Sequence, residues 1–508
     1  MEDARPLERE RRAKVERLRA AGTEPYPWSF PERSLSEEVR SACARLAPGE
    51  SSRDRRWRVA GRLRAIREHG RTAFADIEDA AGSLQVLLRT DLLGEGPYRS
   101  VLADLDPGDI VGSEGWAAVS RRGEPSLEAT SLVLLAKAIA PPPEKFHGLQ
   151  DPEAKLRRRY LDLLASGDTR QRFRVRSALI QEIRRFLDGE GFLEVETPVL
   201  VPVAGGAAAA PFVTRSQYLA AELQLRIALE LPLKRLLVGG LERVFELGKA
   251  FRNEDLDSTH SPEFTELELY WAYADYTDMR GLVERLFSRL ADRTAELLPG
   301  SPAAVRGAQM FRPPFATVDF VEELERRSGI AGILGKSREE LRGLARSAGS
   351  TVPEASSTGT FLDKLFEKYV EPTFDRLTFV VDHPIATTPL AKRHRSKPGR
   401  VERFEVFVPG FELGNAYTEL NDPDEQERRF REQLGERGED RYAPDDDFVR
   451  ALRYGLPPTA GVGFGVDRLL MALLGVPSIK EVLLFPLVRP GAPEPTAAGR
   501  PVGGAERP

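Results

Sequence analysis

Polar side chains between residues 252 and 270 combine the charges and the spacing that nucleotide binding needs. Five of them alternate along two short segments, Arg252 and Glu254 on the first and Glu266, Glu268 and Tyr270 on the second. Alternate residues of a β-strand point to one face, so two strands would gather these side chains on one side of a sheet. The connecting residues 255–263 are rich in Asp, Ser and Pro, which favour a loop, and they include His260. The pattern predicts a hairpin whose loop closes over a phosphate chain, although Arg252 and Glu254 could instead form a surface ion pair contributing about 0–1 kcal/mol.

The composition limits the kinds of protein in which such a hairpin could lie. A chain of 508 residues is long enough for roughly two or three domains. It is 41% hydrophobic and 30% charged, without an apolar run of about 18 residues that could span a membrane. The net charge of −5 argues against non-specific coating of nucleic acid but permits a local basic face. The charged N-terminus predicts no signal peptide, and the single cysteine, Cys43, rules out an intramolecular disulfide, so we expect a cytoplasmic globular protein with no membrane partner.

A small barrel is predicted in the N-terminal third of the chain. Between residues 57 and 139, short apolar runs alternate with Gly and polar turns, a pattern typical of barrel strands. We expect an all-β oligonucleotide-binding (OB) fold over residues 56–143, which would bind nucleotides by stacking bases on aromatic side chains. Phe74 and Gln85 lie on its predicted strands, although a phenylalanine on a strand is more often part of a core. The run Pro141-Pro142-Pro143 cannot continue a strand ladder and marks the expected domain boundary.

The residues before the barrel are expected to form a helical extension over 1–55. Residues 6–21 predict a helix with proline near its first turn and Gly22 just after its end. The balance of its charges is basic, so the helix could lie along nucleic-acid phosphates. Packing through Leu7, Val15 and Leu18 is an equally good interpretation.

The elements after the barrel are predicted from periodicity and from helix-breaking residues. Apolar residues at helical spacing over 172–188 predict an amphipathic helix, and 192–198 predict a strand that runs into proline. Residues 280–400 show weaker patterning and are interpreted as an insertion. The Pro-, Gly- and Ala-rich residues 491–508 predict a disordered tail.

Three motifs in order carry a family resemblance. The runs F-R-N-E (251–254), H-S-P-E-F (260–264) and E-L-Y-W-A-Y-A-D-Y (268–276) resemble motif 2 of class II aminoacyl-tRNA synthetases, in the form found in lysyl-tRNA synthetases. The run G-V-G-F-G-V-D-R (461–468) resembles motif 3, whose glycines allow close backbone approach. The helix and strand ending at Pro198 resemble motif 1, which forms the dimer interface in this class. The resemblance implies a homodimer and an α+β catalytic domain over 144–490, with an antiparallel sheet flanked by helices.

The resemblance also implies a two-step reaction. The lysine carboxylate would attack the α-phosphate of ATP, and the lysyl group would then pass to the 3′ end of tRNA(Lys). Such a displacement depends on positioning and charge neutralisation, so the catalytic residues carried over are Arg252 and Arg468. The residues implied for ATP are Arg252, Glu254, His260, Phe264, Glu405, Glu412 and Arg468, with Phe264 stacked on adenine. Glu405 and Glu412 supply hard oxygen ligands that would hold Mg²⁺ together with the phosphates.

Lysine and tRNA contacts are implied in the same way. The residues implied for lysine are Gly206, Glu230, Glu268, Tyr270, Asn415, Tyr417 and Glu419. Glu230 matches the ligand of the α-amine, and Glu268 and Glu419 would converge on the ε-amine, because a buried ammonium needs an anionic pocket. A structural ion-pair network is the alternative role for those two glutamates. The residues implied for the anticodon are Phe74, Gln85 and Glu124.

The chain departs from the family pattern at five positions near these motifs, namely Ala210, Leu229, Pro232, Ser261 and Glu266. We expect these departures to affect the affinity for substrates more than the identity of the family. Glu266 stands where the family usually has an apolar residue near adenine, and we expect it to point towards the nucleotide or a nearby cation.

Other functions remain as alternatives. The chain could be an aspartyl or asparaginyl ligase of the same subgroup, or a lysine ligase that modifies elongation factor P. The barrel argues against the last of these, because such paralogues lack it. A regulatory protein without catalysis is the more distant alternative, and the retained Arg252, Glu254, Glu405, Glu412 and Arg468 argue against it.

Overall fold

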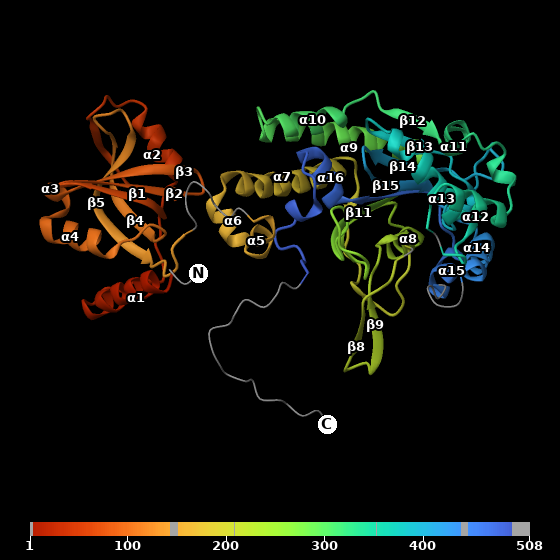
Figure 1. Cartoon of the computed structure of the whole chain (residues 1–508), viewed down its shortest axis with the longest axis horizontal. Coiled ribbons are helices and arrows are strands. Elements are labelled where there is room, and N and C mark those ends of the chain that lie inside the picture. Colours follow the sequence, from red (N-terminus) through yellow and green to blue (C-terminus); the bar gives the residue numbers. More distant parts are fainter. Residues whose placement is uncertain (1–3, 143–150, 208, 352, 438–444, 490–508) are drawn as a thin grey trace. The chain divides into compact units, whose positions relative to one another are not determined.

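The computed structural model describes residues 4–142, 151–207, 209–351, 353–437 and 445–489. The boundary expected at 143–144 and the tail expected at 491–508 lie outside these residues. The chain divides into two compact units, Met1–Gln150 and Asp151–Pro508 (Figure 1). None of the described helices is long and apolar enough to cross a membrane.

The first unit contains the predicted barrel. Its strands are β1 (Ser51–His69), β2 (Thr72–Asp79), β3 (Gly82–Arg89), β4 (Ile110–Val119) and β5 (Pro125–Ala136). They close in the order β1-β2-β3-β5-β4. Two short helices, α3 (Thr90–Leu93) and α4 (Glu95–Asp104), connect β3 to β4. The interior is filled by alternate apolar residues such as Ala75, Ile77 and Val86, as period-two patterning requires. The predicted OB-fold barrel is therefore confirmed.

Two helices precede the barrel and pack on it. Val39 and Cys43 of α2 (Ser36–Cys43) belong to the barrel core, so this part of the expected extension is not separate from the barrel. In α1 (Ala4–Ala20), Arg11 donates to the carbonyl of Ala138 at 2.7 Å and Lys14 pairs with Asp106 at 2.8 Å. Two basic side chains of α1 are thus engaged within the first unit.

The second unit is built on an eight-stranded sheet in the order β12-β13-β14-β15-β16-β11-β10-β6. The strands are β6 (Leu193–Glu194), β10 (Arg243–Phe251), β11 (Glu263–Ala272), β12 (Ala316–Asp319), β13 (Thr378–Val381), β14 (Arg403–Val408), β15 (Phe411–Thr418) and β16 (Thr459–Gly465). The pairs β12–β13 and β10–β6 are parallel, so the predicted antiparallel sheet is mixed at its two edges. The strand expected over 192–198 is only the two residues of β6.

Helices surround this sheet. They are α5 (Pro152–Arg157), α6 (Arg159–Ala165), α7 (Gly167–Gly189), α8 (Glu230–Val238), α9 (Tyr276–Leu297), α10 (Pro302–Met310), α11 (Phe320–Ser328), α12 (Arg338–Ser347), α13 (Thr358–Tyr369), α14 (Pro423–Arg437), α15 (Asp446–Leu452) and α16 (Val466–Leu474). Short 3₁₀ turns are η1 (Ile333–Gly335), η2 (Glu371–Thr373), η3 (Ile385–Thr387) and η4 (Ile479–Glu481). Apolar residues of α7, α9 and α16 form the main core with the sheet (Figure 1), so one sheet face is committed to packing.

The interpretation of residues 280–400 as an insertion needs correction. This stretch supplies β12 and β13 of the central sheet, and Leu282 and Phe287 of α9 lie in the main core. The helices α11, α12 and α13 form a second core cluster, which includes Phe361 together with Val380 and Phe407 of the central sheet. The period of the apolar residues in α9 is the signal that was missed.

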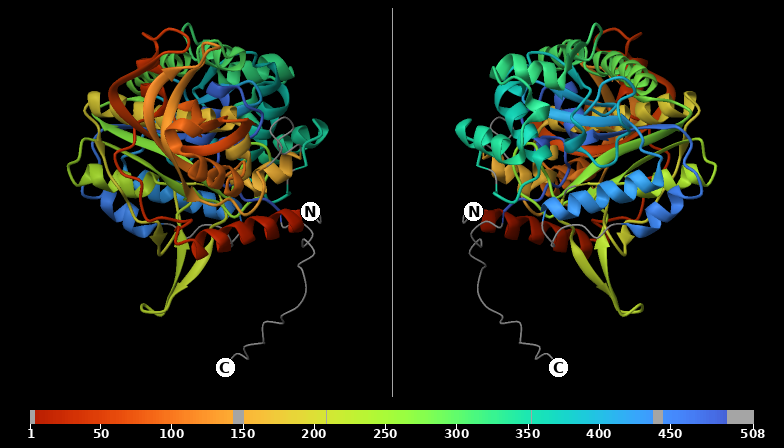
Figure 2. Two further views of the ribbon diagram at one scale, coloured as in Figure 1. Left: turned by 90° about the vertical axis from the view of Figure 1, so that its left-hand side faces the viewer. Right: turned by 90° about the vertical axis from the view of Figure 1, so that its right-hand side faces the viewer.

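A small second sheet extends from this unit. Its strands β7 (Leu200–Val201), β8 (Val213–Ser216) and β9 (Ala221–Leu225) pair in the order β7-β9-β8. Figure 2 shows the β8–β9 hairpin projecting from the body of the unit.

Candidate active site

The polar face of the sheet has a floor made of glycine. In β16, Gly461, Gly463 and Gly465 lie opposite Tyr270, Glu268 and Glu266 of β11. On its other edge β16 pairs with β15, where Gly461 and Gly463 lie opposite Tyr417 and Asn415. A Cβ at Gly461 would come within 2.2 Å of Glu419 Oε1. The motif 3 glycines therefore leave room for side chains from both neighbouring strands.

Two arginines and an aromatic ring meet beside this floor. Arg252 lies with its guanidinium 5.0 Å from the centre of the Phe264 ring. Arg468, at the start of α16, donates to the carbonyls of Thr259 and Glu412 at 3.1 and 3.0 Å. Burial lowers the pKa of Arg468, and the charge of Arg252 lowers it further against the opposing effect of Glu412. The two guanidiniums thus repel each other, and a polyanion placed between them would relieve that repulsion.

The loop after β10 carries the predicted His260. Its Nε2 lies 2.7 Å from Arg468 Nη2 and its Nδ1 lies 2.8 Å from Asp257 Oδ2. Because arginine can only donate, Nε2 accepts and Nδ1 donates to Asp257. His260 thus helps to orient Arg468. Glu254 is exposed in the same loop.

Carboxylates gather at the other side of the floor. Glu405 on β14 and Glu412 on β15 lie on paired strands, and a β-bulge separates their positions. Burial raises the pKa of Glu412 to about 7, and the charge of Glu405 adds to this effect. Arg403 pairs with Glu405, while Glu412 offers hard oxygen donors of the kind that Mg²⁺ prefers. Among the described residues no group of three or more side chains could hold a metal alone, so ligands from ATP would complete the site.

A buried lysine occupies the centre of the expected lysine pocket. Lys234 of α8 is 1% exposed and forms ion pairs with both Glu230 and Glu419. Its ammonium lies 5.2, 5.8 and 5.9 Å from the ring centres of Tyr417, Phe448 and Tyr270. Burial lowers the pKa of a lysine, but the two carboxylates outweigh it, and the pKa of Lys234 is raised. Two carboxyl groups share one ammonium here. Burial raises the pKa of Glu419 to about 8 against the opposing charge of Lys234, so a further cation would favour its ionised form. The sequence analysis missed Lys234, although it follows Glu230 by four residues on a helix, the spacing at which ion pairs form.

Glu268 has a different environment from Glu419. Its Oε1 accepts from the backbone N–H of Leu229 at 2.9 Å, and its Oε2 accepts from the Tyr270 hydroxyl at 2.6 Å. Both oxygens are therefore committed within the protein. This geometry fits the alternative given in the sequence analysis, a structural role for Glu268, better than it fits direct contact with the ε-amine of lysine.

The remaining predicted residues border the same pocket. The Tyr417 hydroxyl donates to Glu230 Oε1 at 2.6 Å. Gly206 has a φ of +89°, and a Cβ there would lie 3.2 Å from the Glu230 Cβ, so glycine meets both the backbone and the space requirement. Asn415 lies opposite Glu405 and Gly463 on the two neighbouring strands.

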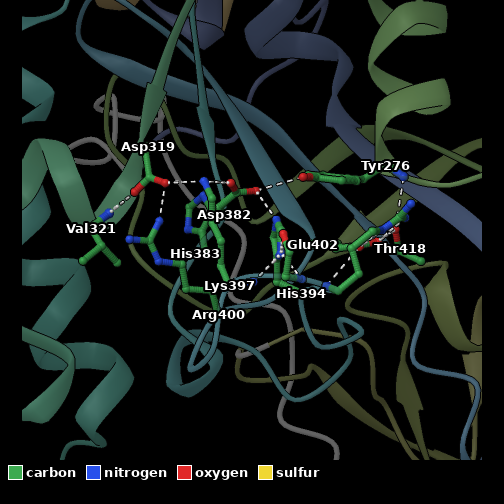
Figure 3. A network of polar contacts seen from close by, with 12 residues as sticks. Tyr276, Asp319, Val321, Asp382, His383, His394, Lys397, Arg400, Glu402 and Thr418 are labelled. Atoms are coloured by element: carbon green, nitrogen blue, oxygen red, sulfur yellow. Dashed lines mark hydrogen bonds and ion pairs between the residues drawn. The ribbon is translucent and has the colours of Figure 1, made fainter.

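A polar network anchors the segment that leads from β13 to β14. Asp319 accepts from Lys397 at 2.9 Å and from Arg400, and Asp382 accepts from the Tyr276 hydroxyl at 2.9 Å (Figure 3). The other members shown include Glu402, which accepts from Thr418 Oγ1 at 2.7 Å. Thr418 precedes Glu419, so the network fixes the backbone beside the lysine pocket.

The three predicted anticodon residues lie together in the first unit. Phe74, Gln85 and Glu124 line one cavity of about 1320 Å³, which is also lined by Arg64 and Arg67. The Phe74 ring is half-buried in the cavity wall, not enclosed in the core. Basic groups next to an accessible ring suit a single-stranded nucleic acid.

Comparison with known proteins agrees with this site. A family model described as "tRNA synthetases class II (D, K and N)" matches residues 151–489, and one described as "OB-fold nucleic acid binding domain" matches residues 57–135. The chain therefore belongs to the class II tRNA synthetases of the group that serves aspartate, lysine and asparagine.

Relatives that match along nearly the whole chain show which family of this group the chain belongs to. The chain is 44% identical to lysine–tRNA ligase of Moorella thermoacetica, over 94% of this chain and 96% of the relative. It is 46% identical to lysine–tRNA ligase of Roseiflexus castenholzii, over 95% and 99%. It is 44% identical to lysine–tRNA ligase 2 of Methanosarcina acetivorans, over 94% and 93%. Within the class II group it belongs to the family of lysine–tRNA ligases.

Proposed function

We propose that this enzyme activates L-lysine with ATP to lysyl-adenylate and diphosphate, and then transfers the lysyl group to tRNA(Lys), releasing AMP. The observation that carries the proposal is the pair of buried carboxyl groups, Glu230 and Glu419, that share the single ammonium of Lys234, beside the arginines Arg252 and Arg468. An amino acid with a cationic side chain can supply a second partner for these carboxyl groups. The anionic side chain of aspartate would be repelled by them, and neutral asparagine could not form an ion pair with them.

The chemistry needs no protein nucleophile. Arg252 and Arg468 would hold the α-phosphate and stabilise the charge that develops when the lysine carboxylate attacks it. Asn415 and Arg252 would orient that carboxylate, and Phe264 would stack on adenine. Glu405 and Glu412 would hold Mg²⁺, which supplies positive charge to the phosphates when bound.

We further propose that the anticodon of tRNA(Lys) binds in the cavity lined by Phe74, Gln85 and Glu124. The enzyme would act in the cytoplasm as a homodimer through the motif 1 region. Large apolar side chains there support this interface, because Leu193, Leu200 and Val203 are each at least 41% exposed. Sedimentation velocity on the purified chain tests the dimer, and a concentration-independent monomer would contradict it.

Diphosphate exchange with ATP, measured for each of the twenty amino acids, tests the activity. We expect exchange that depends on lysine and on Mg²⁺, followed by charging of tRNA(Lys) in a separate assay. Exchange with aspartate or asparagine in place of lysine would overturn the proposed specificity. A complete lack of exchange would favour a regulatory protein.

A further inference from the structure

Most buried carboxylates on the polar face of the sheet are already satisfied by the protein. Glu246 accepts from Thr197 and Arg226, and Glu268 accepts from Leu229 and Tyr270. Within the described ranges, buried carboxylate oxygens without a partner occur on only two residues, Glu266 (Oε2) and Glu419 (Oε1). Glu419 still has its ion pair with Lys234. The candidates to receive the two ammonium groups of lysine are therefore these two glutamates and Glu230, whose Oε2 lies beside Gly206.

Glu266 is enclosed by protein, and the guanidinium of Arg226, which lies over the opposite Gly248, donates to Glu246. Glu266 is 9% exposed, and the residues opposite it on both neighbouring strands are glycines, Gly248 and Gly465. No side chain from those two positions can cover its carboxylate. An oxygen in such a place has lost its water without gaining a donor, which costs free energy until a donor arrives.

The neighbours of Glu266 indicate which donor would arrive. Its Oε1 lies 3.8 Å from Arg252 Nη2, an ion pair without a hydrogen bond. Burial raises the pKa of Glu266 to about 7 against the opposing charge of Arg252, and the negative charge of Glu230 adds to the rise. The charges of both Arg252, which would hold the lysine carboxylate, and Glu230 therefore act on Glu266. A guanidinium and a carboxylate 3.8 Å apart complement an α-carboxylate and an α-ammonium that are joined through one carbon.

Lys234 and the Tyr417 hydroxyl occupy Oε1 of Glu230 and leave its Oε2 for that α-ammonium, which has three N–H donors and can bind a second acceptor. We propose that Glu266, together with Glu230, accepts a hydrogen bond from the α-ammonium of the amino-acid substrate and is a substrate-binding residue of this enzyme. Glu419 would serve the ε-ammonium at the other end of the pocket. The inference rests on the proposed function, since it needs an amino acid as the substrate and uses lysine in its test.

The test compares lysine with 6-aminohexanoic acid, which is lysine without its α-amine. The Michaelis constant for lysine and the inhibition constant for 6-aminohexanoic acid are measured in lysine-dependent diphosphate exchange for the wild type, Glu266→Gln and Glu266→Leu. We expect Glu266→Leu to raise the Michaelis constant for lysine about 10- to 100-fold, because a hydrogen bond between charged groups is lost. Glu266→Gln should raise it less. Binding of 6-aminohexanoic acid and the Michaelis constant for ATP should change less than about twofold, since neither ligand uses the lost contact.

Glu419→Gln is the matched control. It should weaken the binding of lysine and of 6-aminohexanoic acid alike, because both ligands carry the ε-ammonium. Equal weakening of both ligands by Glu266→Leu, or no weakening, would overturn the inference. A change in the Michaelis constant for ATP alone would assign Glu266 to the nucleotide and would also overturn it. Absence of exchange in the wild type would overturn the proposed function first, so the two failures are distinguishable.

A measurement on the wild type covers the case in which the variants do not fold. Only ionised Glu266 attracts the α-ammonium, so affinity for lysine relative to 6-aminohexanoic acid should rise between about pH 6 and pH 8, the range around the raised pKa of Glu266. A ratio that is independent of pH would contradict the inference.

Discussion

Lys234 and Glu419 form an ion pair in which each residue is 1% exposed to solvent. Glu230 is the second partner of the same ammonium. The pocket thus contains an internal ammonium as well as the carboxylates that would receive one from the substrate. Burial holds the pKa of Glu419 at about 8 despite the charge of Lys234, so a second cation that enters the pocket would favour the ionised form of Glu419.

Lys234→Met should destabilise the enzyme by about 3–5 kcal/mol, because it leaves two buried carboxylates without their shared cation. Thermal unfolding without substrate measures the change, and added lysine should recover part of the loss. Lys364→Met is the matched control, since the Lys364–Glu367 pair is exposed and should contribute about 0–1 kcal/mol. Equal effects of the two substitutions would contradict the role of Lys234.

Glu419→Gln and Glu268→Gln should behave differently although the chemical change is the same. Glu419→Gln should raise the Michaelis constant for lysine at least about tenfold, because an ion pair with the substrate is lost. Glu268→Gln should chiefly lower stability, by about 1–3 kcal/mol, because one of its two internal donors loses a good acceptor. Steady-state kinetics and thermal unfolding on both variants separate the two roles, and a purely kinetic effect of Glu268→Gln would count against this assignment.

Arg252→Ala and Arg468→Ala should each reduce lysine-dependent diphosphate exchange at least about 100-fold at saturating substrates, since each removes a charge that stabilises the transition state. Near-ultraviolet circular dichroism spectra like that of the wild type would show that the fold is retained. Arg289, an exposed arginine on α9, offers a control whose change to alanine should leave turnover unaltered. Substantial turnover in either active-site variant would remove that arginine from the catalytic assignment.

Phe74→Ala should weaken aminoacylation of tRNA by about 1–3 kcal/mol in kcat/KM, because a base loses its stacking partner. Exchange of diphosphate should be unaffected. Phe74→Leu keeps an apolar side chain without an aromatic face, so it should share the defect if stacking is the cause. Wild-type charging by the leucine variant would indicate that Phe74 acts by packing alone.

Glu266→Leu should change the dependence of stability on pH. The pKa of Glu266 is raised in the folded state from 4.5 to about 7, so the folded enzyme holds a proton that the unfolded chain has released. The stability of the wild type therefore falls as pH rises through this window, and the variant lacks that fall. The difference in melting temperature between variant and wild type, measured without substrate, should shift in favour of the variant from about pH 5 to pH 8. Glu263→Leu, at an exposed glutamate of the same strand, should show no such trend, and a flat difference for Glu266→Leu would contradict the shifted pKa.

Local patterns in the sequence were sufficient for much of the fold and for the composition of the site. Alternation of residues 266, 268 and 270 predicts a common strand face, and the structure has these three side chains on β11 opposite the glycines of β16. The predicted barrel is present because alternate apolar residues such as Ala75 and Ile77 fill its interior. These features depend on neighbours in sequence, and their periods can be read without knowing the fold.

The hydrogen-bond partners of the site residues were decided only by tertiary structure. Glu268 and Glu266 share a strand face and a chemical type, yet Leu229, 39 residues from Glu268, donates its N–H to Glu268, while Glu266 keeps an oxygen without a partner. Likewise, Lys234 meets Glu419 only because α8 packs against the central sheet, where Leu233 shares a core with Tyr270 and Tyr417. Whether a carboxylate is satisfied or available depends on which distant groups the folded chain brings within about 3 Å, and no local period contains that information.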